Sequence, residues 1–195
     1  IIMKLHLWSA GLVVLFLACE PRPAEVAKPP LDINTLLATQ ANTLSQYGVS
    51  LIKTAAVENA VPDTTTRVLT SKEWSVELDA FRDLGMINKQ STWDLYHSEG
   101  PLDDPRSNLH IQRYSSDKTP LRTLSIYYST ELQRMHRIEG VVHEENSLYT
   151  AHRNLLLEFE DVQGKPLLTH YEIRGYQKLA LRDSVPFRIH GVIKW

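Results

Sequence analysis

The chain has 195 residues, a formal net charge of −2 at pH 7 and a single cysteine. This charge is too small to favour nucleic acid or another strongly charged partner, and one cysteine excludes an intrachain disulfide or a zinc site built from several cysteines. The composition is that of an ordinary globular protein, and a chain of this length is sufficient for one domain with a sizeable core.

The N-terminal segment combines a positive charge, an apolar run and the cysteine. Lys4 precedes the apolar run from Leu7 to Leu17, and Phe16-Leu17-Ala18-Cys19 ends it. This order resembles the lipobox of bacterial lipoproteins, in which a signal peptidase cleaves before a cysteine that carries lipid. The resemblance implies that residues 1–18 are a signal peptide, which is removed, and that Cys19 is the lipidation site.

Two other interpretations of this segment explain less. The apolar run of about 11 residues is shorter than the roughly 20 that cross a bilayer as a helix. A plain secretory signal would leave Cys19 as a free thiol, whereas acylation accounts for it. Glu20 stands where enterobacterial lipoproteins retained in the inner membrane carry Asp, so the resemblance favours the outer membrane over the inner membrane. We therefore expect the protein to be held in a bacterial cell envelope by a lipid on Cys19.

A tether and one domain are predicted after the cysteine. Residues 19–30 include four prolines, and proline-rich segments are extended spacers of about 3 Å per residue. Residues 31–195 are expected to form a single α+β domain.

Two helices are predicted in the first part of this domain. Asp32 can cap a helix, and apolar residues recur at helical spacing over residues 33–58, with Gly48 as a point for a kink or a break. The sequence Thr70-Ser71-Lys72-Glu73 has the pattern of a capping box and predicts a second helix that Gly85 can end. Residues 86–107 are irregular and favour a long loop or a short element near 93–96.

From about residue 108 the apolar period changes to two, which predicts strands. Leu124, Ile126 and Tyr128 alternate with polar or outward residues, and four further segments show the same alternation up to Trp195. With a shorter strand near 109–114, the pattern predicts a six-strand antiparallel meander covered by the N-terminal helices, curved as a half-barrel.

One face of this sheet is expected to carry many polar side chains. These residues are His152, Arg174, Arg137, Glu139, Glu172, His170, His190 and Lys194. They form either a recognition surface or, more simply, the solvated face of a half-buried sheet. A metal site is not predicted, because the strand register needed to bring three histidines together is unknown and nearby arginines oppose a cation.

The other face carries an anomaly at Arg153, which shares the parity of Ala151, Leu155 and Leu157. A charge on a buried face is costly unless it is paired. Three arrangements would accommodate this charge. In the first, the sheet is open at this level; in the second, a bulge turns Arg153 outward; in the third, a carboxylate from the helical layer binds it. The first alternative predicts a ligand groove, whose candidate residues are Arg153, His136, Tyr171 and Trp195.

The segment from residue 94 to residue 110 is the remaining candidate for chemistry. It contains Asp94, His97, Glu99, Asp103, Asp104 and His110. No calcium-loop or paired-histidine spacing is present, and no nucleophile elbow or nucleotide-binding motif occurs. We predict a solvated acidic loop and assign no catalytic residue, no metal and no cofactor.

Three functions remain open at this stage. The first is a lipid-anchored module that binds an apolar or amphipathic ligand; coarsely, the predicted fold resembles the half-barrels of periplasmic lipoprotein carriers and outer-membrane lipoprotein receptors, a likeness that transfers no function. The second is an interaction lipoprotein that docks on an envelope protein. The third is an envelope hydrolase that uses residues 94–110. We favour a non-enzymatic protein that binds an apolar or amphipathic ligand or an envelope protein.

Overall fold

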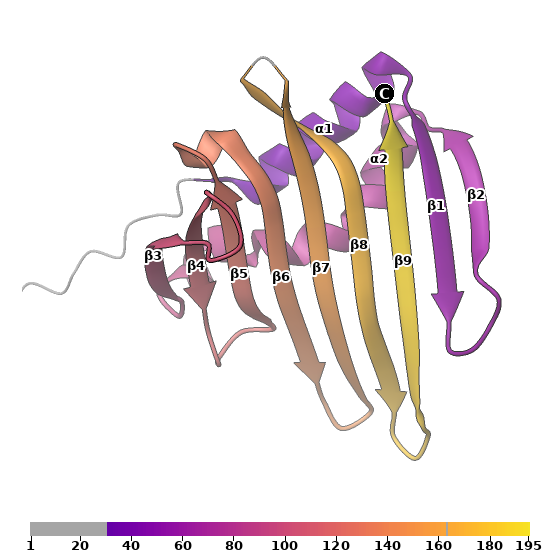
Figure 1. The fold of residues 1–195 in the computed structure, drawn as a ribbon. Coiled ribbons are helices and arrows are strands. Elements are labelled where there is room, and N and C mark those ends of the chain that lie inside the picture. The colour runs from indigo at the N-terminus through magenta and orange to yellow at the C-terminus, as the bar shows by residue number, and fades with distance from the viewer. Residues whose placement is uncertain (1–30, 163) are drawn as a thin grey trace, which may run out of the picture.

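The structure, a computed structural model, describes residues 31–162 and 164–195. The predicted signal peptide, Cys19 and the tether lie outside the described residues. The described chain is a nine-strand antiparallel sheet with helices packed on one face (Figure 1). The strands are β1 (Ser50–Val57), β2 (Asp63–Val68), β3 (His97–Asp103), β4 (His110–Ser115), β5 (Leu121–Tyr128), β6 (Met135–Glu145), β7 (Tyr149–Val162), β8 (Lys165–Leu179) and β9 (Ser184–Lys194). The helices are α1 (Ile33–Tyr47), α2 (Ser71–Leu78), η1 (Asp79–Asn88), α3 (Gln90–Trp93) and η2 (Leu132–Arg134), of which η1 and η2 are 3₁₀ helices.

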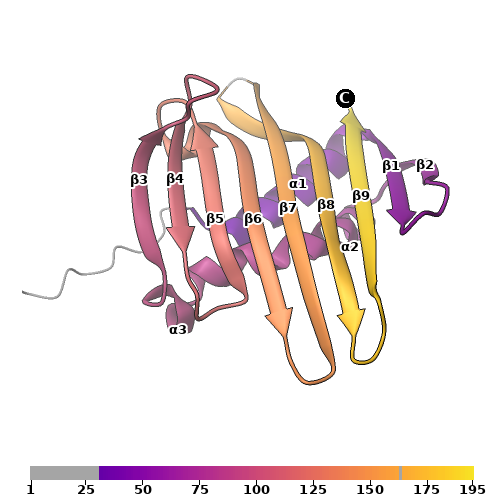
Figure 2. The same ribbon diagram turned by 60° about the horizontal axis from the view of Figure 1, so that its bottom comes forward.

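The strand order is β2-β1-β9-β8-β7-β6-β5-β4-β3. Strands β3 to β9 form a meander, and the β1–β2 hairpin adds to it beside the last strand. The predicted α+β class is confirmed. The predicted number of six strands is wrong, because β1, β2 and β3 extend the sheet at both edges. The half-barrel is also wrong, since the sheet is neither closed nor strongly curled (Figure 2).

The predicted helix over residues 33–58 is correct only in its first part. Asp32 caps α1 by accepting a hydrogen bond from the Thr35 N–H at 3.1 Å, as predicted. Gly48 adopts a left-handed φ of +63° and donates its N–H to the last carbonyls of the helix. This conformation ends helices, and the chain continues as β1. The apolar residues at 51, 52 and 55 fit a strand as well as a helix. The spacing of apolar residues therefore could not show that the helix ends before residue 50.

The predicted second helix has its capping box, with Thr70 and Glu73 each bonding the other's backbone N–H. Gly85 does not end this helical segment, because the chain continues as η1 through that position. A side chain there would have its Cβ 2.5 Å from the Asn34 Oδ1, so glycine allows η1 to lie close to α1. The predicted loop over 94–110 is wrong, because its central part is β3. Gly100, Pro101 and a bulge between Glu99 and Leu102 break the period of this strand and hid it.

The hydrophobic core lies between the helices and the inner face of the sheet. Its largest fully buried side chains include Trp74, Tyr171, Phe81, Leu44 and Leu84. Gly140 and Gly191 face the same layer, and a Cβ at either would lie 2.2 Å from Leu84 or from the Tyr171 ring. The helices cover only this face, so the same strands present their alternate side chains to solvent on the other face (Figures 1 and 2).

Candidate functional site

Arg153 lies on the inner face, at the level where it pairs with Val142 across β6 and β7. Its guanidinium donates to the Asp83 Oδ2 of η1 at 2.8 Å and to the Glu144 Oε1 at 2.7 Å. Glu144 also accepts a hydrogen bond from the Tyr149 hydroxyl at 2.9 Å, and this contact raises the Tyr149 pKa. Of the three alternatives weighed for Arg153, the structure therefore shows the carboxylate from the helical layer.

The structure does not bring the four candidate groove residues together. Tyr171 is fully buried and donates its hydroxyl to Glu77 at 2.5 Å; burial, and then this carboxylate, raise its pKa well above the ordinary value. Trp195 is half-exposed and contacts the Tyr47 ring edge-on at 5.5 Å. His136 lies six residues before Val142, the partner of Arg153, and therefore about 20 Å away along β6.

The core beneath the helices is closed. Leu44, Trp74 and Phe81 are fully buried and pack in one cluster, with Leu36 against it. Phe81 meets the Tyr171 ring edge-on at 5.6 Å. A ligand carrier needs an apolar concavity in this region, and these side chains occupy it.

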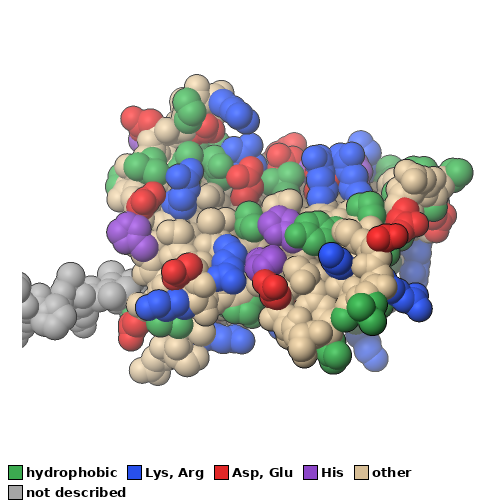
Figure 3. Space-filling model, turned by 90° about the horizontal axis from the view of Figure 1, so that it is seen from below, with side chains coloured by type: hydrophobic (Ala, Val, Ile, Leu, Met, Phe, Trp, Pro, Cys, Tyr) green, Lys and Arg blue, Asp and Glu red, His purple; other side chains and the backbone are tan. Residues whose placement is uncertain are grey.

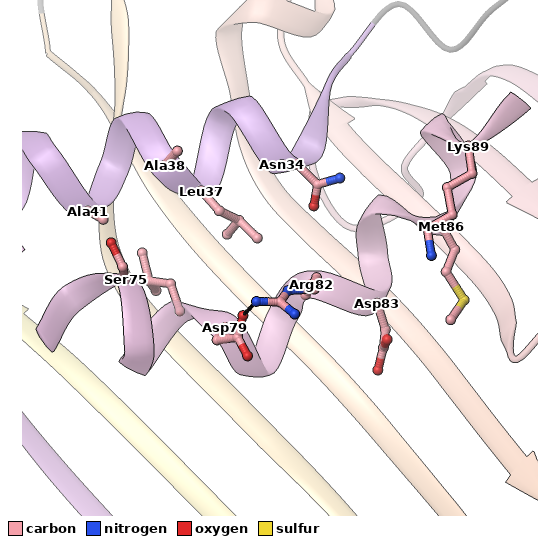
Figure 4. A pocket seen from close by; sticks show the side chains of 11 residues that line it. Asn34, Leu37, Ala38, Ala41, Ser75, Asp79, Arg82, Asp83, Met86 and Lys89 are labelled. Carbon is pink, nitrogen blue, oxygen red and sulfur yellow. Dashed lines mark ion pairs between the residues drawn. The ribbon is translucent and has the colours of Figure 1, made fainter. Parts of the chain in front are cut away.

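A groove does open on the solvent side of the helical layer, between α1 and the α2–η1 segment (Figure 4). Its volume is about 470 Å³. The apolar part consists of Leu37, Ala38, Ala41, Leu78 and Met86, and the polar part consists of Asn34, Ser75, Asp79, Arg82, Asp83 and Lys89. The two alanines on α1 keep the groove open, because larger side chains at these helical positions would fill it.

Hydrogen bonds hold both sides of this groove. The Ser71 hydroxyl bonds the Asn42 side chain at 2.7 Å, which joins α2 to α1. At the other end, the Asn88 side chain accepts the Ile33 N–H at 3.1 Å and donates to the Leu31 carbonyl at 2.7 Å. These contacts fix α1 against α2 and η1, so the groove is a preformed feature of the helical layer.

The charges around the groove are mostly neutralised. Arg82 pairs with Asp79 one turn earlier, and Asp83 is bound by Arg153 from beneath. No ion pair of Lys89 occurs within the described chain, so this ammonium is a cation available to an incoming group. The groove therefore suits an amphipathic partner. The apolar side chains of such a partner would lie on Ala38 and Ala41, and an acidic group of the partner would lie near Lys89 (Figure 4).

The outer face carries the polar residues predicted for it. The register places His152, Asn154, Glu172, Arg174, His170 and His190 on the same side of β7, β8 and β9, and Arg137 and Glu139 on that side of β6. The His170 and His190 rings meet edge-on at 4.6 Å, and His152 stacks on Tyr176 at 5.7 Å. Across the described ranges 31–162 and 164–195, no group of three or more His, Cys, Asp or Glu side chains is arranged to hold a metal ion.

Glu172 is the centre of the ion pairs on this face. It is buried although it lies on the uncovered side, because Arg174 and Arg188 lie over it and bind its carboxylate. Burial alone would raise the Glu172 pKa, but hydrogen bonds from both arginines outweigh burial and lower it. Burial and the neighbouring His170 lower the His190 pKa. Each of these groups has a partner on the sheet.

One histidine–carboxylate pair in the segment 94–110 lies within hydrogen-bond reach. His110 Nδ1 lies 3.1 Å from Asp103 Oδ1, because the two residues pair across β3 and β4. The Asp103 side chain is 93% exposed at the edge of the sheet, and the pair lines none of the grooves described. Asp104 is buried and bound instead by the Ser107 hydroxyl and the Arg106 N–H, which lower its pKa. The sequence indicated both carboxylates as candidates. It did not predict the pairing of β3 with β4, which places Asp103 beside His110, while Asp104 is bound by the turn that follows.

The groove itself was not found from the sequence. Its residues belong to two helical segments that are at least 34 positions apart. The sequence feature that could have indicated the groove is the pair of small residues Ala38 and Ala41 on an amphipathic helix, which was not singled out. No helix in the part of the chain that the structure describes is long and apolar enough to cross a bilayer. Comparison with protein families, with curated proteins and with solved structures found no match for this chain.

Proposed function

We propose that this chain is a lipid-anchored bacterial envelope lipoprotein, without enzymatic activity, that docks on an envelope protein through the groove between α1 and the α2–η1 segment. The observation that carries the docking part is an open, preformed groove with an apolar floor above a closed core. The anchoring part is supported by the sequence alone, through the lipobox-like segment that ends at Cys19, and Glu20 favours the outer membrane.

The groove favours a helix as its occupant. Its wall on α1 runs from Asn34 to Ala41, which is about 10 Å or two helical turns. Amphipathic helices bind such grooves with apolar residues at i, i+3 or i+4 and i+7. Small residues such as Ala38 and Ala41 allow a partner helix to come close. Lys89 at one end favours a partner with an acidic residue beside its apolar stripe.

The two other functions receive less support. A ligand carrier would need space inside the helical layer, where Leu44, Trp74 and Phe81 are packed. A hydrolase would need a nucleophile and a cleft beside His110 and Asp103, whereas this pair lies exposed at a sheet edge. Docking uses a surface that the fold already presents.

Site-specific crosslinking in the native envelope tests this proposal. A photo-crosslinking residue at Ala38, which is exposed in the groove, is compared with one at Thr39, which is exposed on α1 outside it. We expect Ala38 to crosslink to a single protein through an amphipathic helix identified by mass spectrometry, and Thr39 not to do so. Ala38→Trp, which fills the groove, should reduce binding of that purified partner at least about tenfold.

Three outcomes would contradict the proposal. Equal crosslinking from Ala38 and Thr39 would remove the groove from the interaction. Adducts of lipid alone at Ala38 would favour the ligand-binding alternative. Mass spectrometry of the N-terminal peptide tests the anchor separately, and a mature protein without acyl chains on Cys19 would exclude it.

A further inference from the structure

Two hairpins extend beyond the rest of the domain. The β6–β7 and β8–β9 hairpins project past the ends of β4, β5, β1 and β2, and past the helices (Figures 1 and 2). Neither face of the sheet is covered by a helix near their turns. The core therefore does not explain the side chains that these turns carry.

Three leucines are exposed at the turns of these hairpins. Leu181 is fully exposed, Leu148 is 72% exposed and Leu179 is 47% exposed. The two turns are joined, because the Ala180 N–H donates to the Leu148 carbonyl at 2.8 Å. We refer to Leu148, Leu179 and Leu181 as the tip cluster. These three apolar side chains are exposed at the ends of two hairpins that are joined to each other.

Leu181 also has an unusual backbone conformation. Its φ is +63°, in the left-handed region, where Gly, Asn and Asp are favoured and a branched apolar residue is rare. Among the described residues, the other positive φ values belong to Gly48, Gly100, Gly164 and Glu58, so Leu181 is the only apolar residue in this set. A polar or glycine residue at 181 would suit both the turn and water better than leucine. Folding alone therefore gives no reason for a leucine at this position.

The charges around the tip cluster are mixed. Lys178 and Arg182 flank it on the β8–β9 hairpin, while Asp183 and Glu145 lie on the same two hairpins. The end of the molecule that carries these turns is seen from below in Figure 3, where hydrophobic, basic and acidic side chains are interspersed. Attraction to anionic lipid would be small here, so the apolar side chains must provide most of any contact.

We propose that the tip cluster inserts into the surface of the bilayer to which Cys19 is anchored. This inference rests on the proposed lipid anchor. A bilayer fits this surface because the leucines project from turns rather than forming a flat patch, and interfacial insertion needs only a few apolar side chains buried about 5–10 Å deep. The 12 residues from 19 to 30 reach about 36 Å when extended, which keeps the hairpins near the bilayer and makes a weak contact effective. The groove on the helical layer stays free for its protein partner.

A fluorescent probe on the full, acylated protein tests the insertion. The protein is reconstituted in vesicles of phosphatidylethanolamine and phosphatidylglycerol, and acylation of Cys19 leaves no native thiol free for labelling. An environment-sensitive dye is attached to Leu181→Cys or to the control Lys165→Cys, an exposed residue at the β7–β8 turn on the opposite end of the sheet. We expect the dye at 181 to emit at shorter wavelength and to be quenched by lipids brominated in their acyl chains roughly twofold or more above the dye at 165.

Adding Leu148→Lys and Leu179→Lys to the Leu181→Cys protein gives a second test. Both positions are exposed, so the fold should persist, which circular dichroism checks, and quenching at 181 should fall to the level of the control. The result should change little when phosphatidylcholine replaces phosphatidylglycerol, because apolar contact dominates.

The outcomes that overturn the inference are separable from failure of the anchor. If the protein floats with the vesicles and carries acyl chains but the dyes at 181 and 165 are equally exposed to water, insertion is excluded and the anchor stands. If the dye at 181 is shielded only after envelope proteins are added, the tip cluster binds a protein instead. If acylation and flotation are both absent, the anchor fails and the inference fails with it.

Discussion

The inner and outer faces of β7 and β8 differ in what covers them, although they belong to the same two strands. Leu155, Leu157 and Tyr171 point inward and are buried under α1, α2 and η1. The residues between them along the strands, such as His170 and Arg174, point outward and bind the carboxylates of Glu158 and Glu172 on the same face without a covering layer. The alternation of a strand therefore determines which side chains share a face, while the helices determine which face becomes the core.

The two faces also use arginine differently. Arg153, on the inner face, joins the sheet to η1 through Asp83 and to β6 through Glu144. On the outer face, Arg174 and Arg188 share one carboxylate, Glu172, within the sheet itself. The first contact connects layers, and the second only connects strands. We expect their contributions to stability to differ accordingly.

The strongest test of this comparison removes a side chain between the layers. Phe81→Ala deletes a fully buried ring that packs on Tyr171, and we expect it to lower the free energy of unfolding by about 3–5 kcal/mol. Val76→Ala, on an exposed position of α2, should change it by no more than about 0.5 kcal/mol. Urea denaturation followed by circular dichroism measures both. Equal losses would mean that the helical layer does not form the core.

A second test compares the arginines of the two faces. Arg153→Met keeps an unbranched apolar stem but leaves Asp83 and Glu144 close together without a cation, so we expect a loss of about 2 kcal/mol. Arg174→Met should cost less than Arg153→Met, because Arg174 is more than half exposed and Arg188 still binds Glu172. Denaturation at neutral pH measures the difference. An equal or greater cost at Arg174 would contradict the distinction between the faces.

The smallest effect concerns the pH dependence of the outer face. The Glu172 pKa is lower in the folded protein than its ordinary value of 4.5. The folded state therefore binds fewer protons, and the stability that Glu172 contributes is present above pH 4.5 and is lost as the pH falls through the lowered pKa. We expect the wild-type protein to lose more stability than Glu172→Gln below pH 4.5, by about 1 kcal/mol or less.

Parallel acid titrations of the two proteins, each followed by urea denaturation, measure this difference. At neutral pH the wild-type protein should be the more stable of the two. A stability difference that is constant from neutral to acidic pH would show that the two arginines do not hold Glu172 in its charged form.

Local patterns predicted the elements that depend on neighbours in the sequence. The Thr70–Glu73 capping box, the Asp32 cap and the alternation in β4 to β9 all appear in the structure. The helix and strand periods could not be separated over residues 50–57, and Gly100 and Pro101 concealed β3. The four residues predicted to line a ligand groove, which are Arg153, His136, Tyr171 and Trp195, do not meet in the structure. Each was placed by the alternation along its strand, and this alternation gives the face of the sheet but not the level along the strand.

By itself, the sequence determined the α+β class, the polar outer face and the inward position of Arg153, because side-chain period and capping are local properties of the chain. Only the tertiary structure decided that the sheet has nine strands, that Asp83 binds Arg153 and that a groove opens between α1 and the α2–η1 segment. These features bring together residues that are far apart in sequence, and their positions depend on how the layers pack rather than on the pattern within any one segment.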